Sequence, residues 1–191
     1  MDEAVPAGTG GMAAILGMEK DKVEELCREA SKGEVVVPAN FNCPGQIVIS
    51  GHAGAVNRAV DLAKEKGAKA IPLPVSAPSH SPLMYPAGER LAKELEKIGV
   101  MDIKCPVISN ADADFYPSKD MVSSLLVKQL SMPVRWEESV AKAVSSGADA
   151  FVEIGPGKVL CGLLKRINRE LKSFNIEDVD SLKALQTAFK A

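Results

Sequence analysis

The chain has 191 residues, 46% of them apolar, which is enough to bury a sizeable core in one domain or two small ones. Lys and Arg number 23 against 25 for Asp and Glu, and this net charge of −2 argues against nucleic acid or an anionic membrane as the main partner. Aromatic residues make up only 4%, too few for a base-stacking surface.

No segment has the pattern of a signal peptide or a membrane span, and the expected location is therefore cytoplasmic. The four cysteines lie far apart and form no CxxC pair, so the sequence indicates neither a zinc site nor a redox motif, and no cofactor. Each cysteine sits in an apolar pattern, which predicts buried, reduced thiols. They are Cys27, Cys43, Cys105 and Cys161.

A strand and a helix open the chain. Residues 1–11 are rich in glycine and predict a flexible entry, and residues 12–16 predict a short apolar strand. An amphipathic helix follows, because apolar side chains recur at i, i+3, i+4 and i+7 and Gly33 stands where a C-terminal cap is expected. The stripe consists of Val23, Leu26, Cys27 and Ala30.

A hairpin and a second helix come next. Two β-branched runs, 35–41 and 46–50, flank a turn, the helical stripe repeats over 56–63, and a Pro-interrupted strand of the edge type covers 68–75. The order is βαββαβ, the split-βαβ or ferredoxin-like unit, which we assign to a subdomain spanning residues 5–80. Fold analogy alone assigns no function to this unit.

From residue 81 the pattern changes to longer helices alternating with single strands. Helices are expected over 83–99, from Ser118 to about 129, from Pro133 to Gly147, after Gly157, and over 180–190, with strands at 105–109 and 150–154. Strand, helix, strand, helix predicts part of a parallel α/β sheet. Two strands are too few for such a sheet, so we expect residues 81–191 to be the C-terminal part of a larger α/β core.

The segment 74–84 joins the last strand of the first half to the next helix and contains His80, one of two histidines. Imidazole titrates near neutral pH, so a histidine on a loop between rigid elements is a candidate general base. A surface histidine in a Pro-rich connection is the simpler interpretation, because no serine or cysteine is visibly paired with it. The spacing leaves both interpretations open.

Six stretches, in order, resemble the malonyl-CoA:acyl-carrier-protein transacylase family. They are EAVP at 3–6, MAAILG at 12–17, NFNCPGQ at 40–46, PLPVSAPSH at 72–80, QLSMPVRW at 129–136 and EIGPGKVL at 153–160. The resemblance weakens after about Asn168. It implies an α/β-hydrolase-like acyltransferase core with an inserted ferredoxin-like subdomain. It also implies ping-pong transfer of malonyl from CoA to the phosphopantetheine thiol of acyl-carrier protein in fatty-acid biosynthesis, through a serine and a histidine.

The resemblance gives roles to particular residues. His80 matches the family's catalytic histidine, and Gln129 matches the residue whose backbone carbonyl orients the imidazole. Asn40 and Asn42 match an NxNxPxQ signature beside the cleft, where substrate contact and Asx-turn hydrogen bonds are equally good explanations. Lys69 lies where the family often carries a basic residue for the carrier and the CoA phosphates, although a solvated lysine is the simpler interpretation.

Three further residues are expected to be structural. Asn110 and Lys158 belong to matching motifs, and His52 is expected to be an unpaired loop residue.

The family's nucleophile has no counterpart here. The resemblance implies a serine in a GHSxGE elbow, oxyanion donors from that elbow and a glutamine, and an arginine for the malonyl carboxylate, all preceding the position of Met1. No GxSxG occurs in the sequence. One hypothesis is a partial transacylase whose partners are malonyl-CoA, acyl-carrier protein and the missing N-terminal portion. The other is a non-catalytic carrier-protein or CoA-binding module. The first is favoured, because His80 stands in its full motif.

Overall fold

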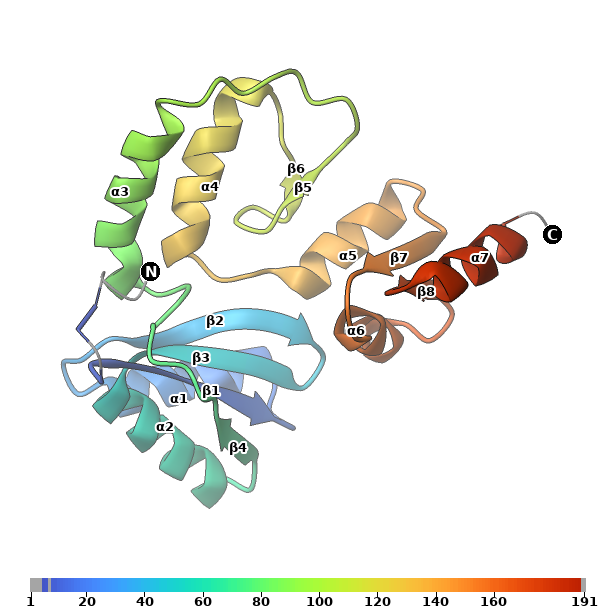
Figure 1. The fold of residues 1–191 in the computed structure, drawn as a ribbon. Coiled ribbons are helices and arrows are strands. Elements are labelled where there is room, and N and C mark those ends of the chain that lie inside the picture. The colour runs from blue at the N-terminus through green and yellow to red at the C-terminus, as the bar shows by residue number, and fades with distance from the viewer. Residues whose placement is uncertain (1–4, 7, 190–191) are drawn as a thin grey trace. The chain divides into compact units, whose positions relative to one another are not determined.

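The computed structural model describes residues 5–6 and 8–189, and the chain divides into two compact units, Met1–Ser139 and Val140–Ala191 (Figure 1). The EAVP stretch and the predicted last helix each extend beyond the described residues. The predicted subdomain boundary at residue 80 stays a prediction.

A four-stranded antiparallel sheet organises the first unit, in the order β2-β3-β1-β4. Its strands are β1 (Gly10–Leu16), β2 (Val36–Cys43), β3 (Gln46–His52) and β4 (Lys69–Pro72), connected through the helices α1 (Lys20–Ser31) and α2 (Ala53–Glu65). Both helices lie on the same face of the sheet (Figure 1). The predicted βαββαβ order is confirmed, and β4 is an edge strand, as its proline indicated.

The two faces of this sheet bury different clusters. Under the helices, Ile15 and Ile49 pack with Leu26, and none of the three has exposed surface. The predicted stripe of α1 is buried there. The opposite face carries a smaller cluster, made of Met12, Ala14, Ala39 and Val48 with Leu73 packed against it. Alternate residues of each strand therefore separate a helix-covered face from a second, thinner one.

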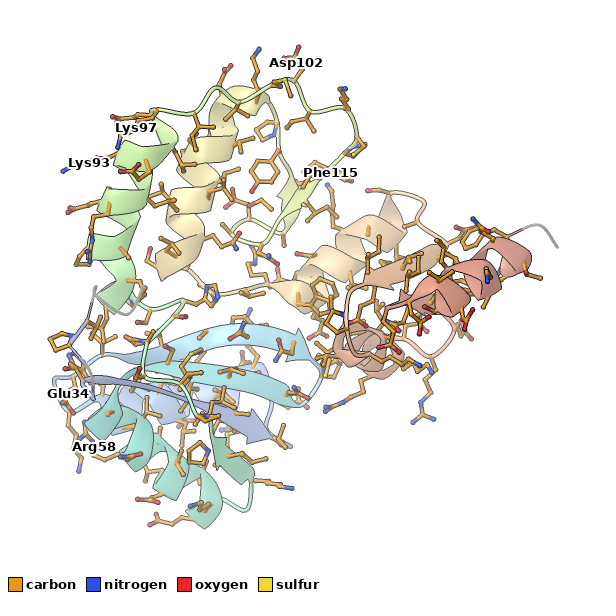
Figure 2. All side chains as sticks on the ribbon, in the orientation of Figure 1. Glu34, Arg58, Lys93, Lys97, Asp102 and Phe115 are labelled. Atoms are coloured by element: carbon orange, nitrogen blue, oxygen red, sulfur yellow. The ribbon has the colours of Figure 1, made fainter. Side chains whose placement is uncertain are left out.

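An arginine joins the two helices. Arg58 of α2 donates to the carbonyl oxygens of Ala30 and Ser31 at the end of α1, at 2.8 and 2.9 Å, and pairs with Glu34 at 2.7 Å (Figure 2). The last carbonyls of a helix lack intrahelical partners, so Arg58 satisfies groups that would otherwise need water.

Several strand boundaries differ from the prediction. The strand predicted over 68–75 covers only Lys69–Pro72, and β3 continues to His52 instead of ending at Ser50. β1 begins at Gly10, so the flexible entry predicted for residues 1–11 is wrong for Gly10 and Gly11. β2 continues through Cys43, which leaves Pro44 and Gly45 as the turn. Pairing across the sheet extends strands beyond their β-branched runs.

The rest of the first unit is less regular. It contains a 3-10 turn at Pro82–Met84, α3 (Tyr85–Leu95), the hairpin of β5 (Ile108–Ser109) with β6 (Asp114–Phe115), a 3-10 turn at Lys119–Met121, and α4 (Val122–Ser131). Helices α3 and α4 lie side by side (Figure 1). Helix α5 (Trp136–Ser145) crosses the boundary between the units.

Four expectations for this region are corrected. The helix predicted over 83–99 begins as a 3-10 turn and ends at Leu95. The strand predicted at 105–109 shrinks to two residues that pair antiparallel with β6. Pro133 precedes α5 instead of lying in its first turn, because its neighbour Val134 pairs with β2. Cys105 is exposed, whereas the other three cysteines are buried as predicted.

In the second unit, β7 (Ala150–Ile154) pairs in parallel with β8 (Lys172–Ile176), and α6 (Val159–Ile167) and α7 (Val179–Ala188) complete the fold. The sequence did not predict β8, because its segment is polar. Glu153 caps α6 by accepting from the backbone N–H groups of Leu160 and Cys161, at 3.0 and 2.8 Å. These bonds, led by the one from Cys161, lower the pKa of Glu153.

Over the described part of the chain, no helix is both long and apolar enough to cross a membrane.

Candidate functional site

His80 lies in a tight turn, residues 78–81, which we call the His80 turn. The backbone φ of His80 is +61°, in the left-handed region, which is uncommon for a residue other than glycine. The backbone N–H of His80 donates to the Leu130 carbonyl at 3.0 Å, and its ring Nδ1 lies 2.9 Å from the Gln129 carbonyl oxygen. Both carbonyls belong to the last turn of α4, where helix carbonyls lack intrahelical partners. The end of α4 therefore fixes both the main chain and the ring of His80.

This contact sets the tautomer of the ring. A carbonyl oxygen can only accept, so the neutral imidazole carries its proton on Nδ1 and presents Nε2 as the proton acceptor. A general base needs this arrangement, with one nitrogen anchored and the other unprotonated. The structure thus brings His80 and Gln129 together in the expected geometry, while the catalytic role of the pair remains a proposal.

The segment after Gln129 also reaches the sheet. Val134 forms a parallel bridge with Asn40: the Phe41 N–H donates to the Val134 carbonyl, and the Val134 N–H to the Ala39 carbonyl, each at 2.8 Å. Asn40 is half-buried and pairs with Val48, which places it on the sheet face away from α1 and α2.

The His80 turn lies over this same face. Gly10 shares its face with Met12, two residues on, and a Cβ at Gly10 would meet Pro78. His80 and Asn40 are therefore joined through the segment 129–134 and share one side of the sheet.

Asn42 and Lys69 are placed differently. Asn42 stands at an irregularity of β2, between Phe41 and Cys43, and is half-buried. Lys69 is exposed and pairs with Leu16, at the end of β1 opposite to Gly10. Six residue steps from Gly10 to Leu16 correspond to roughly 20 Å along the strand, so Lys69 is not brought next to His80.

The three residues expected to be structural have these positions. Asn110 lies in the turn between β5 and β6, and Lys158 is exposed at the start of α6 in the second unit. The expectation that His52 is an unpaired loop residue is wrong. Its Nδ1 accepts from the Val35 N–H at 2.9 Å and its own N–H donates to the Val35 carbonyl at 2.8 Å, so it closes the hairpin edge at the end of β3.

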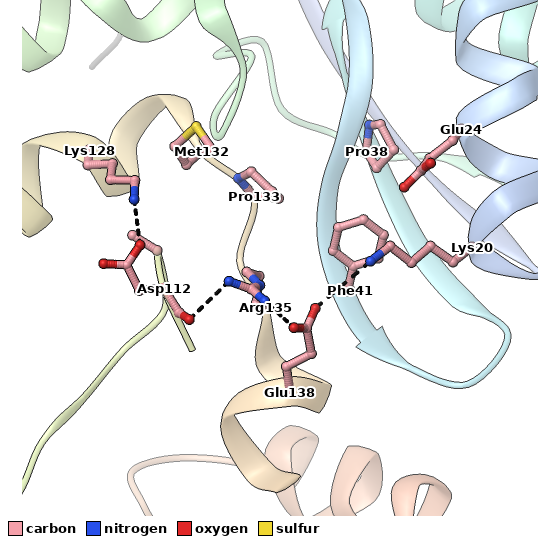
Figure 3. Close-up of a pocket in the computed structure, with 11 residues that line it drawn as sticks. Lys20, Glu24, Pro38, Phe41, Asp112, Lys128, Met132, Pro133, Arg135 and Glu138 are labelled. Carbon is pink, nitrogen blue, oxygen red and sulfur yellow. Dashed lines mark hydrogen bonds and ion pairs between the residues drawn. The ribbon is translucent and has the colours of Figure 1, made fainter. Parts of the chain in front are cut away.

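A cavity of about 480 Å³ opens beside β2, between α1 and the segment 111–138 (Figure 3). Its apolar walls include Phe41, and the Lys20 ammonium lies 4.8 Å from the centre of that ring. Lys20 also lies 4.0 Å from Glu138, which pairs with Arg135. The Arg135 pair lowers the pKa of Glu138.

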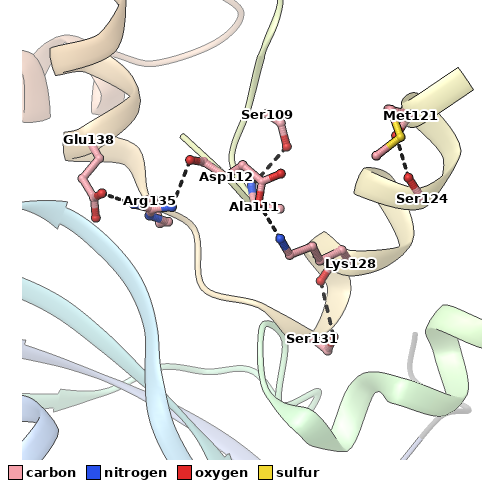
Figure 4. Close-up of polar contacts among 9 residues, drawn as sticks. All are labelled: Ser109, Ala111, Asp112, Met121, Ser124, Lys128, Ser131, Arg135 and Glu138. Atoms are coloured by element: carbon pink, nitrogen blue, oxygen red, sulfur yellow. Dashed lines mark hydrogen bonds and ion pairs between the residues drawn. The ribbon is translucent and has the colours of Figure 1, made fainter. Parts of the chain in front are cut away.

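The same network continues to α4, where Asp112 pairs with Lys128 and its carbonyl accepts from Arg135 at 2.9 Å (Figure 4). Each of the three cations that line the cavity thus faces a carboxylate. These ion pairs connect the segment 111–138 with α1 and with each other. Because each cation already faces a carboxylate, the cavity does not have the character of a binding site for an anion.

Within the described residues, no group of three potential ligands could hold a metal ion.

Sequence reasoning missed the residues that support the His80 turn. They are Gly10, against which Pro78 packs, and Ser81, whose hydroxyl donates to the Pro78 carbonyl at 2.7 Å. The composition of the turn was a usable signal, since Pro and Ser favour turns. Nothing in the sequence linked Gly10 to it.

Comparisons with known proteins identify the family of the chain. The family described as acyl transferase domain matches residues 1–187. The chain is 50% identical to the malonyl CoA-acyl carrier protein transacylase of Bacillus subtilis, over 98% of this chain and 60% of that protein. It is 46% identical to the Escherichia coli K12 protein of the same name, over 96% of this chain and 60% of that protein.

Solved structures give the same result. The malonyl-CoA:acyl carrier protein transacylase of Xanthomonas oryzae superimposes with a TM-score of 0.95 at 43% identity, covering 98% of this chain and 60% of that one. A malonyl-transacylase in complex with its type II PKS acyl-carrier protein gives 0.94 at 44% identity, covering 97% and 61%.

The chain thus spans about 60% of the length of the curated relatives that it matches. Its own length, in contrast, is matched almost from end to end, with a mixed α/β fold. The chain therefore belongs to the acyl transferase domain family, and the relatives that it resembles are malonyl-CoA:acyl-carrier-protein transacylases.

Proposed function

We propose that this chain supplies the catalytic base of a malonyl-CoA:acyl-carrier-protein acyl transfer in the cytoplasm. It would do so as the ferredoxin-like subdomain and C-terminal part of an α/β-hydrolase-like core. The observation that carries the proposal is the 2.9 Å contact between His80 Nδ1 and the Gln129 carbonyl oxygen, which leaves Nε2 as the proton acceptor. The serine nucleophile would come from the part of the family that this chain does not span.

The first half-reaction would load malonyl on the serine. His80 Nε2 takes the serine proton as the hydroxyl attacks the thioester carbonyl, and then gives that proton to the departing CoA thiolate. The imidazolium formed in between keeps its Nδ1–H on the Gln129 carbonyl. A carbonyl dipole stabilises this cation less than a carboxylate would, so Gln129 acts mainly by fixing the orientation of the ring.

The second half-reaction would release malonyl to the carrier. His80 Nε2 takes the proton of the phosphopantetheine thiol as sulfur attacks the malonyl ester, and returns it to the serine oxygen. Atoms and protons balance, because each half-reaction exchanges one acyl group for one proton on the serine.

Malonyl-CoA and acyl-carrier protein are proposed as substrates because the relatives are named for them and one was solved with its carrier. Asn40 is the better candidate for substrate contact, since it lies on the sheet face that the His80 turn covers. Lys69 remains a candidate only for a distant part of the carrier or CoA, given its position at the other end of β1.

The test combines the chain with the missing portion. The chain is incubated with radiolabelled malonyl-CoA and acyl-carrier protein, with and without a polypeptide made of the part of the Bacillus subtilis relative that it does not match. Labelled carrier is expected only when both polypeptides are present. Labelled carrier made by this chain alone would overturn the proposal. A failure to transfer in the mixture, together with tight binding of carrier by the chain alone, would support the non-catalytic module instead.

A substitution tests the base within the active mixture. His80→Ala should lower the transfer rate by roughly two to four orders of magnitude, the usual effect of losing a general base. His52→Gln is the matched control, because His52 is the only other histidine and bonds to Val35 outside the site. Near-normal turnover of the His80→Ala mixture would refute the assignment of the base.

A further inference from the structure

The His80 turn has an unusual construction. A positive φ at the third residue of a four-residue turn, here +61°, is a feature of type II turns, which favour glycine or asparagine at that position. Histidine there is strained, so other contacts must hold it. The hydroxyl of Ser81 provides one from within the turn, by donating to the carbonyl oxygen of Pro78 at 2.7 Å. The Ser81 side chain has no exposed surface, so water does not compete for this bond.

The sheet supports the turn from below. A Cβ built on Gly10 would lie 2.4 Å from Pro78 Cδ and 2.7 Å from the Ser76 carbonyl oxygen, so the turn rests directly on the backbone of β1. Pro78 itself is fully buried. The neighbouring Gly11 faces the other side of the sheet, where a Cβ would meet nothing closer than Ala53 Cα at 3.6 Å. Of these two neighbouring glycines, only Gly10 is approached closely by the segment that leads into the turn.

We propose that Ser81 and Gly10 are positioning residues for His80, which keep the Nδ1–H of its ring on the Gln129 carbonyl. Ser81 holds the turn that carries His80 in its left-handed conformation, and Gly10 sets the height of that turn above the sheet. Without either, the main chain of the turn relaxes and the ring leaves the end of α4. The proposal deepens the proposed function, on which it rests, by naming what orients the base.

The chain offers an internal reference for the test. His80 is held at Nδ1 by an acceptor, whereas His52 Nδ1 accepts from the Val35 N–H, so the two neutral rings must be opposite tautomers. The chain has only these two histidines. Long-range proton–nitrogen NMR correlation on the full chain labelled with ¹⁵N-histidine, above the pH at which the rings are protonated, should show one Nδ1–H ring and one Nε2–H ring. A His80→Gln sample identifies the His80 signals.

Substitutions with matched controls then test the positioning. Ser81→Ala should lower the Nδ1–H to Nε2–H ratio of His80 about fivefold, the factor that one ordinary hydrogen bond is worth, while His52 is unchanged. Ser50→Ala is its control, because Ser50 is equally buried but its hydroxyl has no hydrogen-bond partner. Gly10→Ala should have the same effect as Ser81→Ala, and Gly11→Ala should have none.

The outcomes separate this inference from the proposed function. A wild-type-like His80 tautomer in Ser81→Ala and Gly10→Ala, or an equal change in the control variants, would overturn the positioning role and leave the base assignment intact. An Nε2–H ring for His80 in the unsubstituted chain would count against the base assignment itself. A Gly10→Ala protein that loses the dispersed amide signals of the sheet would be unfolded, and the Ser81→Ala result then decides.

Discussion

Gly51→Ala should destabilise the first unit more than an ordinary strand substitution. Gly51 lies in β3 opposite Val36, and a Cβ built on it would stand 2.0 Å from the Val35 carbonyl oxygen and 2.7 Å from the carbonyl carbon. Both of these atoms belong to the backbone, so no side chain can turn away. The start of β2 must move by more than 1 Å to reach ordinary contact, where few Cβ atoms come closer than 3.4 Å.

That movement breaks the contacts that His52 makes with Val35. The two hydrogen bonds, at 2.8 and 2.9 Å, are each worth about 1 kcal/mol net. Overpacking adds about 1–3 kcal/mol, and the stiffer unfolded chain gives back about 0.4–1 kcal/mol. The expected loss in the free energy of unfolding is therefore about 2–5 kcal/mol.

Gly11→Ala is the matched control, because Gly11 is the cross-strand partner of Gly51 and its Cβ would have room. Its free energy of unfolding should stay within about 1 kcal/mol of the parent. Urea unfolding followed by circular dichroism gives the totals, and amide exchange in β1 and β3 isolates the first unit. Equal stabilities of the two variants would refute the close approach of Gly51 to Val35.

Three further predictions concern single groups. Ser50→Ala should leave the free energy of unfolding unchanged or raise it by up to about 1 kcal/mol in urea titrations, because the buried hydroxyl forms no hydrogen bond; a loss above that size would reveal a partner. The cap that Glu153 provides for α6 should be fully present above pH 4.5 and be lost as the pH falls through the lowered pKa of the folded state. The amide protons of Leu160 and Cys161 should therefore lose protection from exchange in acid, and Glu153→Gln should remove this pH dependence. A thiol reagent should label Cys105 first, because Cys105 is exposed, whereas burial raises the pKa of the Cys27 thiol to about 12. A fast reaction with the reagent that persists in Cys105→Ser would contradict this.

Local patterns in the sequence were sufficient for the regular part of the first unit. The apolar stripe of α1 follows from the 3.6-residue period of its own side chains. The turn at Pro44 and Gly45 follows from two residue types that favour turns. The resemblance to a family then located His80 and the carbonyl of Gln129, which lie 49 residues apart.

The tertiary structure decided the strand pairing, the hydrogen bonding and the burial that depend on neighbours distant in sequence. β8 forms from a polar segment because β7 supplies its partner, and Val134 leaves the expected helix because the edge of β2 accepts it. His52 is paired and Cys105 is exposed for the same kind of reason, since neighbours distant in sequence set hydrogen bonding and burial. Gly10 gives the clearest case: composition alone made it a flexible residue, and only the approach of Pro78 makes the absence of its side chain a requirement.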